Sequence, residues 1–258
     1  MRNALTQQIL ASVAAMLVSG AVGAGKDAVK EPVKLAQASA EEKKTETSAV
    51  VPISYKAPLR GAPATRVGGG TRSLAMKPIA LSVLAPTDTG YTTRELPTLY
   101  WYVSETLEVP VELSISSTEP LEAAAKPVLE FVMQPPVEKG MHALSLAEHK
   151  VNLKPDVEYQ WFVAVIGNPA QRSNDIIAGG TIKRVVRVDG VRARVEQAPA
   201  ASRPALYAAE GVWYDAIEEL SSLIAAQPDN RELRAQRAAL LEQVGLADAA
   251  AFDRAALR

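Results

Sequence analysis

The chain has 258 residues, of which 48% are hydrophobic and 22% are charged, so it is long enough for one large or two small domains with a hydrophobic core. A formal net charge of −1 provides no overall field that would attract nucleic acid or a membrane surface, and we expect no nucleic-acid partner. The absence of cysteine excludes thiol catalysis, iron–sulfur clusters and cysteine-ligated zinc, and we expect no cofactor.

The N-terminal segment has the pattern of an export signal. Arg2 precedes an apolar run from Ile9 to Val22, and small residues at positions 22–24 form a cleavage site of the small-x-small kind. The run is shorter than the roughly 20 apolar residues that span a membrane. We therefore predict a signal peptide over residues 1–24, export to a bacterial periplasm, and no stable membrane span after signal removal. A secreted protein, or one anchored by an uncleaved signal, is the alternative.

Residues 25–57 are rich in alanine, lysine, glutamate, serine and threonine, and they lack a sustained apolar period. Such a segment buries too little apolar surface to offset the entropy lost on ordering. We predict a flexible linker here.

A glycine-rich segment, RGAPATRVGGGTR, spans residues 60–72. It lacks the Gly-Lys-Ser/Thr end of a phosphate-binding P-loop, because Thr71 and Arg72 follow the glycine triplet. Pro58 and Pro63 stand where a strand would precede a dinucleotide-binding turn. Neither nucleotide-binding motif is present.

Two interpretations of this segment remain. Residues 47–87 carry five basic and no acidic residues, whereas residues 88–138 carry nine acidic and two basic residues. In the first interpretation, many weak ion pairs hold the segment against the acidic region as a connection. In the second, backbone N–H groups of the glycines bind a phosphate or carboxylate of an envelope polymer. We favour the connection; the possible anion or partner contacts are Arg60, Arg66, Gly68, Gly69, Gly70 and Arg72.

From Ile79 onward, short apolar runs alternate with turn residues. Several have the period of two that is typical of half-buried strands; Val111, Leu113 and Ile115, for example, share one face. We predict strands over 79–86, 97–103, 109–116, 127–133, 141–146, 157–166 and 181–188. Regular short strands predict an immunoglobulin-like or fibronectin-III-like β-sandwich over residues 58–195.

One strand carries a more specific pattern. In the stretch NLKPDVEYQWFV, a Leu-x-Pro turn leads into a long strand through a tyrosine and a second aromatic residue, as in immunoglobulin-like and fibronectin-III-like domains. The residues that match are Leu153, Pro155, Tyr159 and Trp161. An aromatic pair on a strand is more often core than ligand platform, so we expect Trp161 in the core.

Tyr100 and Tyr102 share one face of their predicted strand, opposite Trp101. Aromatic rings on an open face can stack on sugar rings. This pair is the best candidate for a carbohydrate platform, provided that the C-terminal helices leave the face uncovered.

The remaining polar residues do not form a catalytic or metal-binding pattern. His142 and His149 are seven apart, which is not a metal-ligand spacing. Ser173 lies outside a G-x-S-x-G nucleophile turn. Glu108 and Glu112 alternate on the solvent side of one strand, which indicates a solvated face rather than an acid–base pair. We predict no catalytic, cofactor-binding or metal-binding residues.

Residues 200–258 have helical periodicity and helix-forming composition. Within them, Ala216, Ile217 and Pro228 fall at the offsets expected for the second helix of a tetratricopeptide repeat. Such repeats need about three copies for a stable solenoid, and this segment is too short for that. We therefore predict a partly tetratricopeptide-like α-helical cap that packs on the sandwich through Trp213 and Ile217, in preference to a peptide-binding groove.

The order of several stretches resembles the uncharacterised bacterial family known as domain of unknown function 928. That family has a Gly-Gly-Gly-Thr-Arg segment, a Pro-Thr aromatic strand, a Tyr-x-Trp strand, an Arg-Ser-x-Asp turn and a helical Trp-Tyr-Asp. Here these lie at residues 68–72, 97–102, 159–161, 172–175 and 213–215. The resemblance covers about residues 59–246; it implies the extent of the domain and brings no established reaction.

These features favour a non-catalytic cell-envelope binding or protein-interaction module, whose partner is an envelope protein or an anionic or glycan polymer. An envelope hydrolase acting on glycan or peptide, and a purely structural support domain, are the alternatives. Surface aromatics on one face would favour ligand binding, whereas a carboxylate pair in a deep cleft would favour the hydrolase. A large exposed apolar patch on the helices would favour a protein partner.

Overall fold

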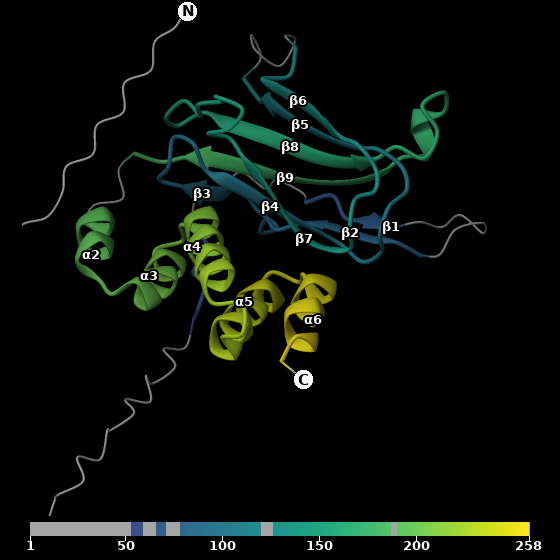
Figure 1. Ribbon diagram of the computed structural model, residues 1–258. Coiled ribbons are helices and arrows are strands. Elements are labelled where there is room, and N and C mark those ends of the chain that lie inside the picture. Colours follow the sequence, from purple (N-terminus) through teal and green to yellow (C-terminus); the bar gives the residue numbers. More distant parts are fainter. Residues whose placement is uncertain (1–52, 59–65, 71–77, 120–125, 187–189, 258) are drawn as a thin grey trace, which may run out of the picture. The chain divides into compact units, whose positions relative to one another are not determined.

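The structure, a computed structural model, describes residues 53–58, 66–70, 78–119, 126–186 and 190–257 (Figure 1). All of these belong to one unit that runs from Ser48 to Arg258. The predicted signal peptide, the predicted linker up to residue 52, and both Arg60 and Arg72 lie outside the described residues.

One antiparallel sheet has the strand order β1-β2-β4-β7. Its strands are β1 (Gly69–Gly70), β2 (Ala80–Val83), β4 (Thr98–Val103) and β7 (Gly140–Ser145). Within it, Trp101 pairs with Val83 on one side and with His142 on the other. β4 is therefore an inner strand, which explains why most of its side chains are buried.

A second sheet has the order β3-β9-β8-β5-β6. Its strands are β3 (Gly90–Thr92), β5 (Val111–Ser117), β6 (Leu129–Met133), β8 (Glu158–Val165) and β9 (Ile176–Arg184). β3 runs parallel to β9, and the other pairs are antiparallel. The buried Tyr159 fixes the turn before β8, because its hydroxyl accepts a hydrogen bond from the Lys154 N–H at 3.1 Å.

Side chains from both sheets contribute to one hydrophobic core. Trp101 from β4 and Trp161 from β8 are fully buried in it. β2 lies against β9, where a Cβ atom on Gly180 would come within 2.5 Å of the Cβ of Ala85. The predictions of a mainly β domain with a helical tail, and of Trp161 in the core, are confirmed. The narrower immunoglobulin-like or fibronectin-III-like assignment stays a prediction.

Strand β9 begins at Ile176 rather than at Thr181, where we predicted it. The difference arises because Gly179 and Gly180 lie inside the strand instead of in a turn. A Cβ atom on Gly179 would lie 2.3 Å from the ring of Phe162 in β8, so glycine makes room for that ring. The sequence pattern also misses β1 and β3, which are two and three residues long and too short for a periodic signal.

The C-terminal part is helical, as predicted. Its helices are α2 (Val191–Gln197), α3 (Arg203–Ala209), α4 (Trp213–Ala226), α5 (Arg231–Gln243) and α6 (Ala247–Ala255). The short 3-10 turn η2 (Ala200–Ser202) lies between α2 and α3. A second 3-10 turn, η1 (Arg172–Asn174), lies earlier in the chain, between β8 and β9. α4 ends shortly before Pro228, which cannot continue a helix. Asn230 caps α5, because its side chain accepts hydrogen bonds from the Glu232 and Leu233 N–H groups.

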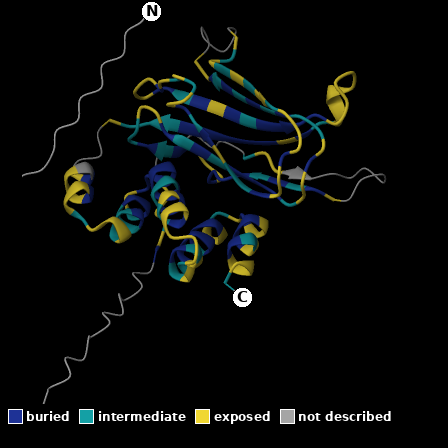
Figure 2. Cartoon of the chain, viewed as in Figure 1, coloured by how far each residue is buried: buried dark blue, intermediate teal, exposed yellow. Residues whose placement is uncertain are grey.

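The helices pack on the β part of the chain. α4 contacts β3 and β4, and one side of this helix is buried (Figure 2). Its buried residues include Trp213 and Ile217. The ring of Tyr55 meets Trp213 edge to face, with centroids 4.9 Å apart. Residues 53–57, which we predicted as the end of the linker, therefore belong to the fold. The helical part begins at Val191, inside the range that we predicted for the sandwich. No helix in the described ranges is long and apolar enough to cross a membrane.

Candidate functional site

The first turn of α4 fixes the helices to both sheets. The Trp213 Nε1–H donates to the Leu84 carbonyl at 2.8 Å. The Trp161 Nε1–H donates to the Tyr214 hydroxyl, which in turn donates to the Thr181 carbonyl, both at 2.9 Å. The three aromatic side chains are fully buried. Their polar atoms are therefore used to hold the helix in place.

Asp215, the next residue of this turn, is fully buried. The Thr92 hydroxyl donates to its Oδ1 at 2.5 Å, the Thr93 N–H donates to its Oδ2 at 3.1 Å, and the Thr93 hydroxyl also donates to Oδ2. Burial raises the pKa of the Asp215 carboxyl, whereas these hydrogen bonds and the nearby Arg94 charge act in the opposite direction. A carboxylate held in this way attaches α4 to the end of β3 and is closed to a substrate.

Further along α4, Arg94 forms ion pairs with Glu218 at 3.1 Å and with Glu219 at 2.5 Å. Glu218 also accepts a hydrogen bond from the Thr98 N–H at 3.0 Å. We refer to the contact between residues 213–219 and the sheets as the α4 junction. Its buried polar groups have partners on the β side, which is typical of a structural contact.

The glycine-rich segment connects the two sheets. Val67 exchanges two backbone hydrogen bonds with Gly179 of β9, at 3.0 and 2.9 Å. Gly69 and Gly70 then pair with Leu81 and Ala80 of β2, in the other sheet. The chain thus crosses from one sheet to the other within a few residues. Pairing occupies backbone groups that an anion-binding loop would need, and the arrangement matches the connecting role that we favoured.

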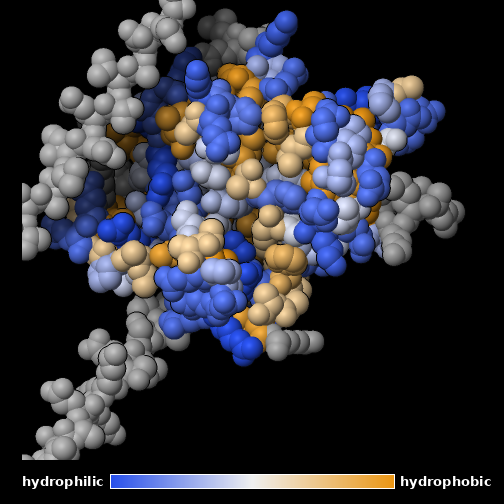
Figure 3. Space-filling view, in the orientation of Figure 1, coloured by the Kyte–Doolittle hydropathy of each residue, from blue (hydrophilic) through white to orange (hydrophobic). Residues whose placement is uncertain are grey.

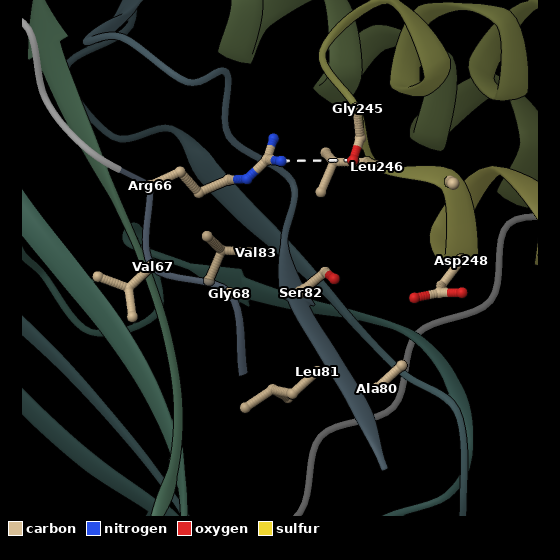
Figure 4. Close-up of a pocket in the computed structure, with 11 residues that line it drawn as sticks. Arg66, Val67, Gly68, Ala80, Leu81, Ser82, Val83, Gly245, Leu246 and Asp248 are labelled. Carbon is tan, nitrogen blue, oxygen red and sulfur yellow. Dashed lines mark hydrogen bonds between the residues drawn. The ribbon is translucent and has the colours of Figure 1, made fainter. Parts of the chain in front are cut away.

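Arg66 is bound to the helices. Its Nη1 donates to the carbonyls of Ala85 at 3.0 Å and Val244 at 2.8 Å, and its Nη2 donates to the Gly245 carbonyl at 3.4 Å (Figure 4). Val244 follows the last residue of α5, where free carbonyls carry the partial negative charge of a helix C-terminus. Burial lowers the pKa of Arg66. We expected Arg66 to pair with the acidic region. That prediction is wrong, because backbone carbonyls hold its guanidinium instead.

Hollows follow the boundary between the four-stranded sheet and the helical part, from α5 and α6 to the C-terminal half of α4; we call this boundary the seam. Among the described residues, three adjacent hollows of about 230, 500 and 350 Å³ lie along it. The first and second share Asp248, and the second and third share Lys139, Gly140 and Phe252. The principal lining residues are Arg66 and Gly68 in the first hollow, Tyr102 and Lys139 in the second, and Tyr100, Arg234 and Arg237 in the third.

The first hollow is the one drawn in Figure 4. Arg66 from the glycine-rich segment and Asp248 from α6 border it, with Ser82 of β2 between them. Gly68 also lines this space, and a Cβ atom placed there would meet no other atom within 4 Å. The structure therefore places Arg66 and Gly68, two of the predicted contact residues, at the edge of a cavity.

The helices cover the predicted carbohydrate platform, so that prediction is corrected. Tyr102 is only 8% exposed, and its ring packs against Phe252 of α6 with centroids 5.6 Å apart. Tyr100 is half-buried near Ser221 and Ser222 of α4, and burial raises the pKa of its hydroxyl. The two tyrosines do not form an open stacking surface. They instead line neighbouring hollows of the seam.

Basic groups dominate the third hollow. Arg237 is 5% exposed and donates from Nε and Nη2 to the two carboxylate oxygens of Asp253, both at 2.7 Å. The Nη1 of Arg234, one turn earlier on α5, lies 3.5 Å from Asp253 Oδ1. Lys139 borders the hollow from the turn before β7. Figure 3 shows hydrophilic residues gathered over α5, beside hydrophobic residues over α6.

Four residues of this region lie outside the patterns from which we predicted a site: Lys139, Arg234, Arg237 and Asp253. Three of them carry a usable signal. Arg234 and Arg237 are three apart and so share a helix face, and Asp253 stands on the same side of α6 as the buried Ala249. A carboxylate among buried helix positions indicates a buried ion pair. Lys139 carries no such signal, because the other charged residues of the hollow, Arg234 and Arg237, are distant from it in the sequence.

The two histidines lie apart from each other. His142 stacks on Trp101 with centroids 4.3 Å apart, and His149 contacts Phe131 at 4.7 Å. In the part of the chain that the structure describes, no cluster of three or more histidine, aspartate or glutamate residues is arranged to hold a metal ion.

The loop between β8 and β9 is held by ion pairs. Arg172 contacts Glu112 of β5 at 3.1 Å and Asp175 at 2.5 Å. Ser173 is exposed in the short turn η1, which places it at the surface rather than in one of the seam hollows. Glu112 is therefore part of a surface ion pair, and Glu108 lies separately in the exposed turn before β5.

A family model described as Domain of Unknown Function (DUF928) matches residues 67–253. The chain belongs to this family. The resemblance drawn from the sequence is thereby confirmed, and the DUF928 match includes the glycine triplet, both sheets and the residues of all three hollows except Arg66, Ala255 and Ala256. No curated protein matches this DUF928 chain. Among solved structures, a multi-domain immunophilin from Arabidopsis thaliana aligns over 77% of this chain and 99% of its own at 10% identity, with a TM-score of 0.17. A structural similarity this low carries no conclusion on fold or function.

Proposed function

We propose that this DUF928 member is an exported, non-catalytic binding module of the bacterial cell envelope, with the seam as its ligand site. The N-terminal signal pattern supports export to the periplasm. The two sheets that share one core support an immunoglobulin-like sandwich as a rigid scaffold, on which the helices form a cap. The partner is a glycan or protein of the envelope.

One observation carries the proposal: three adjacent hollows follow a single boundary and are lined by tyrosine, phenylalanine and basic side chains. Ligand sites combine apolar walls with a few polar groups that fix orientation. A row of adjacent hollows suits an extended ligand better than a compact one. The helices form one wall of this site. They pack over the face of β4 that carries Tyr100 and Tyr102, which we had expected to be exposed, and leave hollows beside it.

The state of the carboxylates supports binding rather than hydrolysis. A general acid or base must lie within hydrogen-bond reach of the substrate. Asp215 is fully enclosed by threonine donors, and Asp253 is enclosed by two arginines. Glu112 is occupied by Arg172. These three groups have structural partners, which leaves Asp248 as the carboxylate that borders the first and second hollows of the seam.

Filling the first hollow tests this function. Gly68→Leu adds a side chain where a Cβ atom meets nothing within 4 Å, so the fold should tolerate it. Gly167→Leu is the matched control, because a Cβ atom there is equally free and the residue lies in the exposed loop after β8. Each chain is immobilised and incubated with a bacterial envelope extract, and bound glycans and proteins are identified by mass spectrometry.

We expect the wild-type chain and Gly167→Leu to retain the same ligand, and Gly68→Leu to lose most of it at an unchanged melting temperature. Equal retention by Gly68→Leu would show that the ligand site lies elsewhere. If no chain retains a ligand, the structural support domain becomes the better account.

A further inference from the structure

The third hollow, which we call the basic hollow, is defined by Tyr100, Lys139, Ser221, Arg234, Arg237 and Phe252. Its charges do not balance. Two guanidinium groups face one carboxylate, Asp253, which is fully buried. Lys139 adds a further positive charge, and its ammonium group has no ion-pair partner among the described residues. The basic hollow therefore has surplus positive charge.

The arginines also have unused hydrogen-bond donors. A guanidinium group carries five N–H donors. Three donors of Arg237 are used, two by Asp253 and one by the Ser221 hydroxyl at 3.0 Å. Arg234 donates from Nε to the Pro228 carbonyl at 3.1 Å. The free N–H groups of the mostly buried Arg237 are costly unless a ligand or water accepts from them.

The neighbouring second hollow has a different character. It is lined by Tyr102, Ser104 and Phe252, and its charged side chains are Lys139, which it shares with the basic hollow, and Asp248. An anionic group next to Asp248 would be repelled, whereas sugar hydroxyls can donate to that carboxylate. The seam thus offers one position for an anion and an adjacent position for an uncharged, ring-shaped unit.

We propose that the seam binds an acidic glycan in which a carboxylated sugar occupies the basic hollow and an uncharged sugar occupies the second hollow. This inference rests on the proposed function and adds the chemical class of the ligand. The carboxylate accepts from Lys139 and Arg234, since guanidinium and carboxylate groups have matching geometry. Phe252, shared by both hollows, packs against the sugar rings. The Tyr100 hydroxyl, whose pKa burial raises, remains a neutral donor.

Calorimetric titration of the full chain with defined oligosaccharides tests the ligand class. The acidic probe is a hyaluronan tetrasaccharide, in which carboxylated and uncharged sugars alternate, and the neutral probe is a chitin tetrasaccharide. The variants are Lys139→Ala and Arg234→Gln, which leave the Arg237–Asp253 pair intact. Lys126→Ala is the matched control, because this lysine is exposed and lies just before β6 in the other sheet.

We expect the acidic probe to bind at least about tenfold more tightly than the neutral probe, and each seam variant to lose about tenfold, as for the loss of one charge-assisted hydrogen bond. Lys126→Ala should bind like the wild-type chain, and added salt should weaken binding. Equal binding of the two probes, no binding of the acidic probe, or full affinity in both variants would overturn the proposal. If the acidic probe fails while Gly68→Leu still abolishes retention of an envelope ligand, this inference falls and the proposed function stands.

Discussion

The α4 junction and the seam join the same helical region to the same β part, yet they are built differently. At the α4 junction, Trp213, Tyr214 and Asp215 are fully buried and their polar atoms are bonded to the sheets. Along the seam, by contrast, Lys139 has no ion-pair partner in the described part of the chain. The difference supports our proposal that the first contact stabilises the fold, whereas the second leaves unmatched charge for a ligand.

Deleting helices α3 to α6 should have the largest effect. A chain that ends at residue 200 lacks both the α4 junction and the seam, so the surface around Leu84 and β3 loses its cover. We expect aggregation, or strong binding of a dye that reports exposed apolar surface. Size-exclusion chromatography and dye fluorescence measure this. A monomeric, equally stable truncated chain would instead show that the helices are an independent module.

Trp213→Ala should have the next largest effect, because it removes a fully buried ring and the donor to Leu84. We expect a loss of about 3–5 kcal/mol in the free energy of unfolding, as for other buried aromatics, and the same range for Trp161→Ala. Urea denaturation measures both. Phe252→Ala is the comparison within the seam; because this ring is only partly buried and borders two hollows, its loss should cost clearly less. An equal loss in the free energy of unfolding for Trp213→Ala and Phe252→Ala would contradict the distinction between the α4 junction and the seam.

Arg66→Ala should have the smallest effect of the three. It removes hydrogen bonds from a partly buried guanidinium to carbonyls of Ala85 and α5, and hydrogen bonds to charged groups contribute about 1.5–3 kcal/mol. Solvent exposure places our expectation at the low end of that range. Thermal melting and binding to anionic envelope polymers are measured on the same variant, alone and with Arg72→Ala.

The two roles of the glycine-rich segment give opposite results in that experiment. Stability lost with binding unchanged is the result for a connection between the sheets and the helices. Binding lost at unchanged stability would show instead that the segment contacts the ligand, either as an anion-binding loop or as the border of the first hollow. Arg66→Lys retains the charge but not the two-pronged geometry, so it should recover only part of the stability.

Local patterns predicted the strands well, because alternation along one strand reports burial directly. Val111, Leu113 and Ile115 are all buried, as their period of two indicates. The same approach failed for Gly179 and Gly180, because a glycine that makes room for a neighbouring ring has the same sequence signal as a glycine in a turn. β1 and β3 were too short to give any signal.

The candidate site could be predicted only in part. Tyr100, Tyr102, Arg66 and Gly68 were recognised from the sequence, but their surroundings depend on contacts between distant segments. The platform became a groove because α4 and α6 pack over β4, and local periodicity does not specify that packing. Arg66 bonds to backbone carbonyls, which every residue possesses, so no partner could be identified by type.

The most direct test of the central claim, that the seam is the ligand site and the α4 junction is structural, is amide hydrogen exchange of the full chain with and without its envelope ligand. We predict added protection in residues 66–68, 139–143 and 247–256, the segments that contain residues bordering the hollows. The first part of α4 should be protected already and should not change. Protection confined to β5, β6 and β8, or absent from the seam while the ligand is bound, would contradict the account.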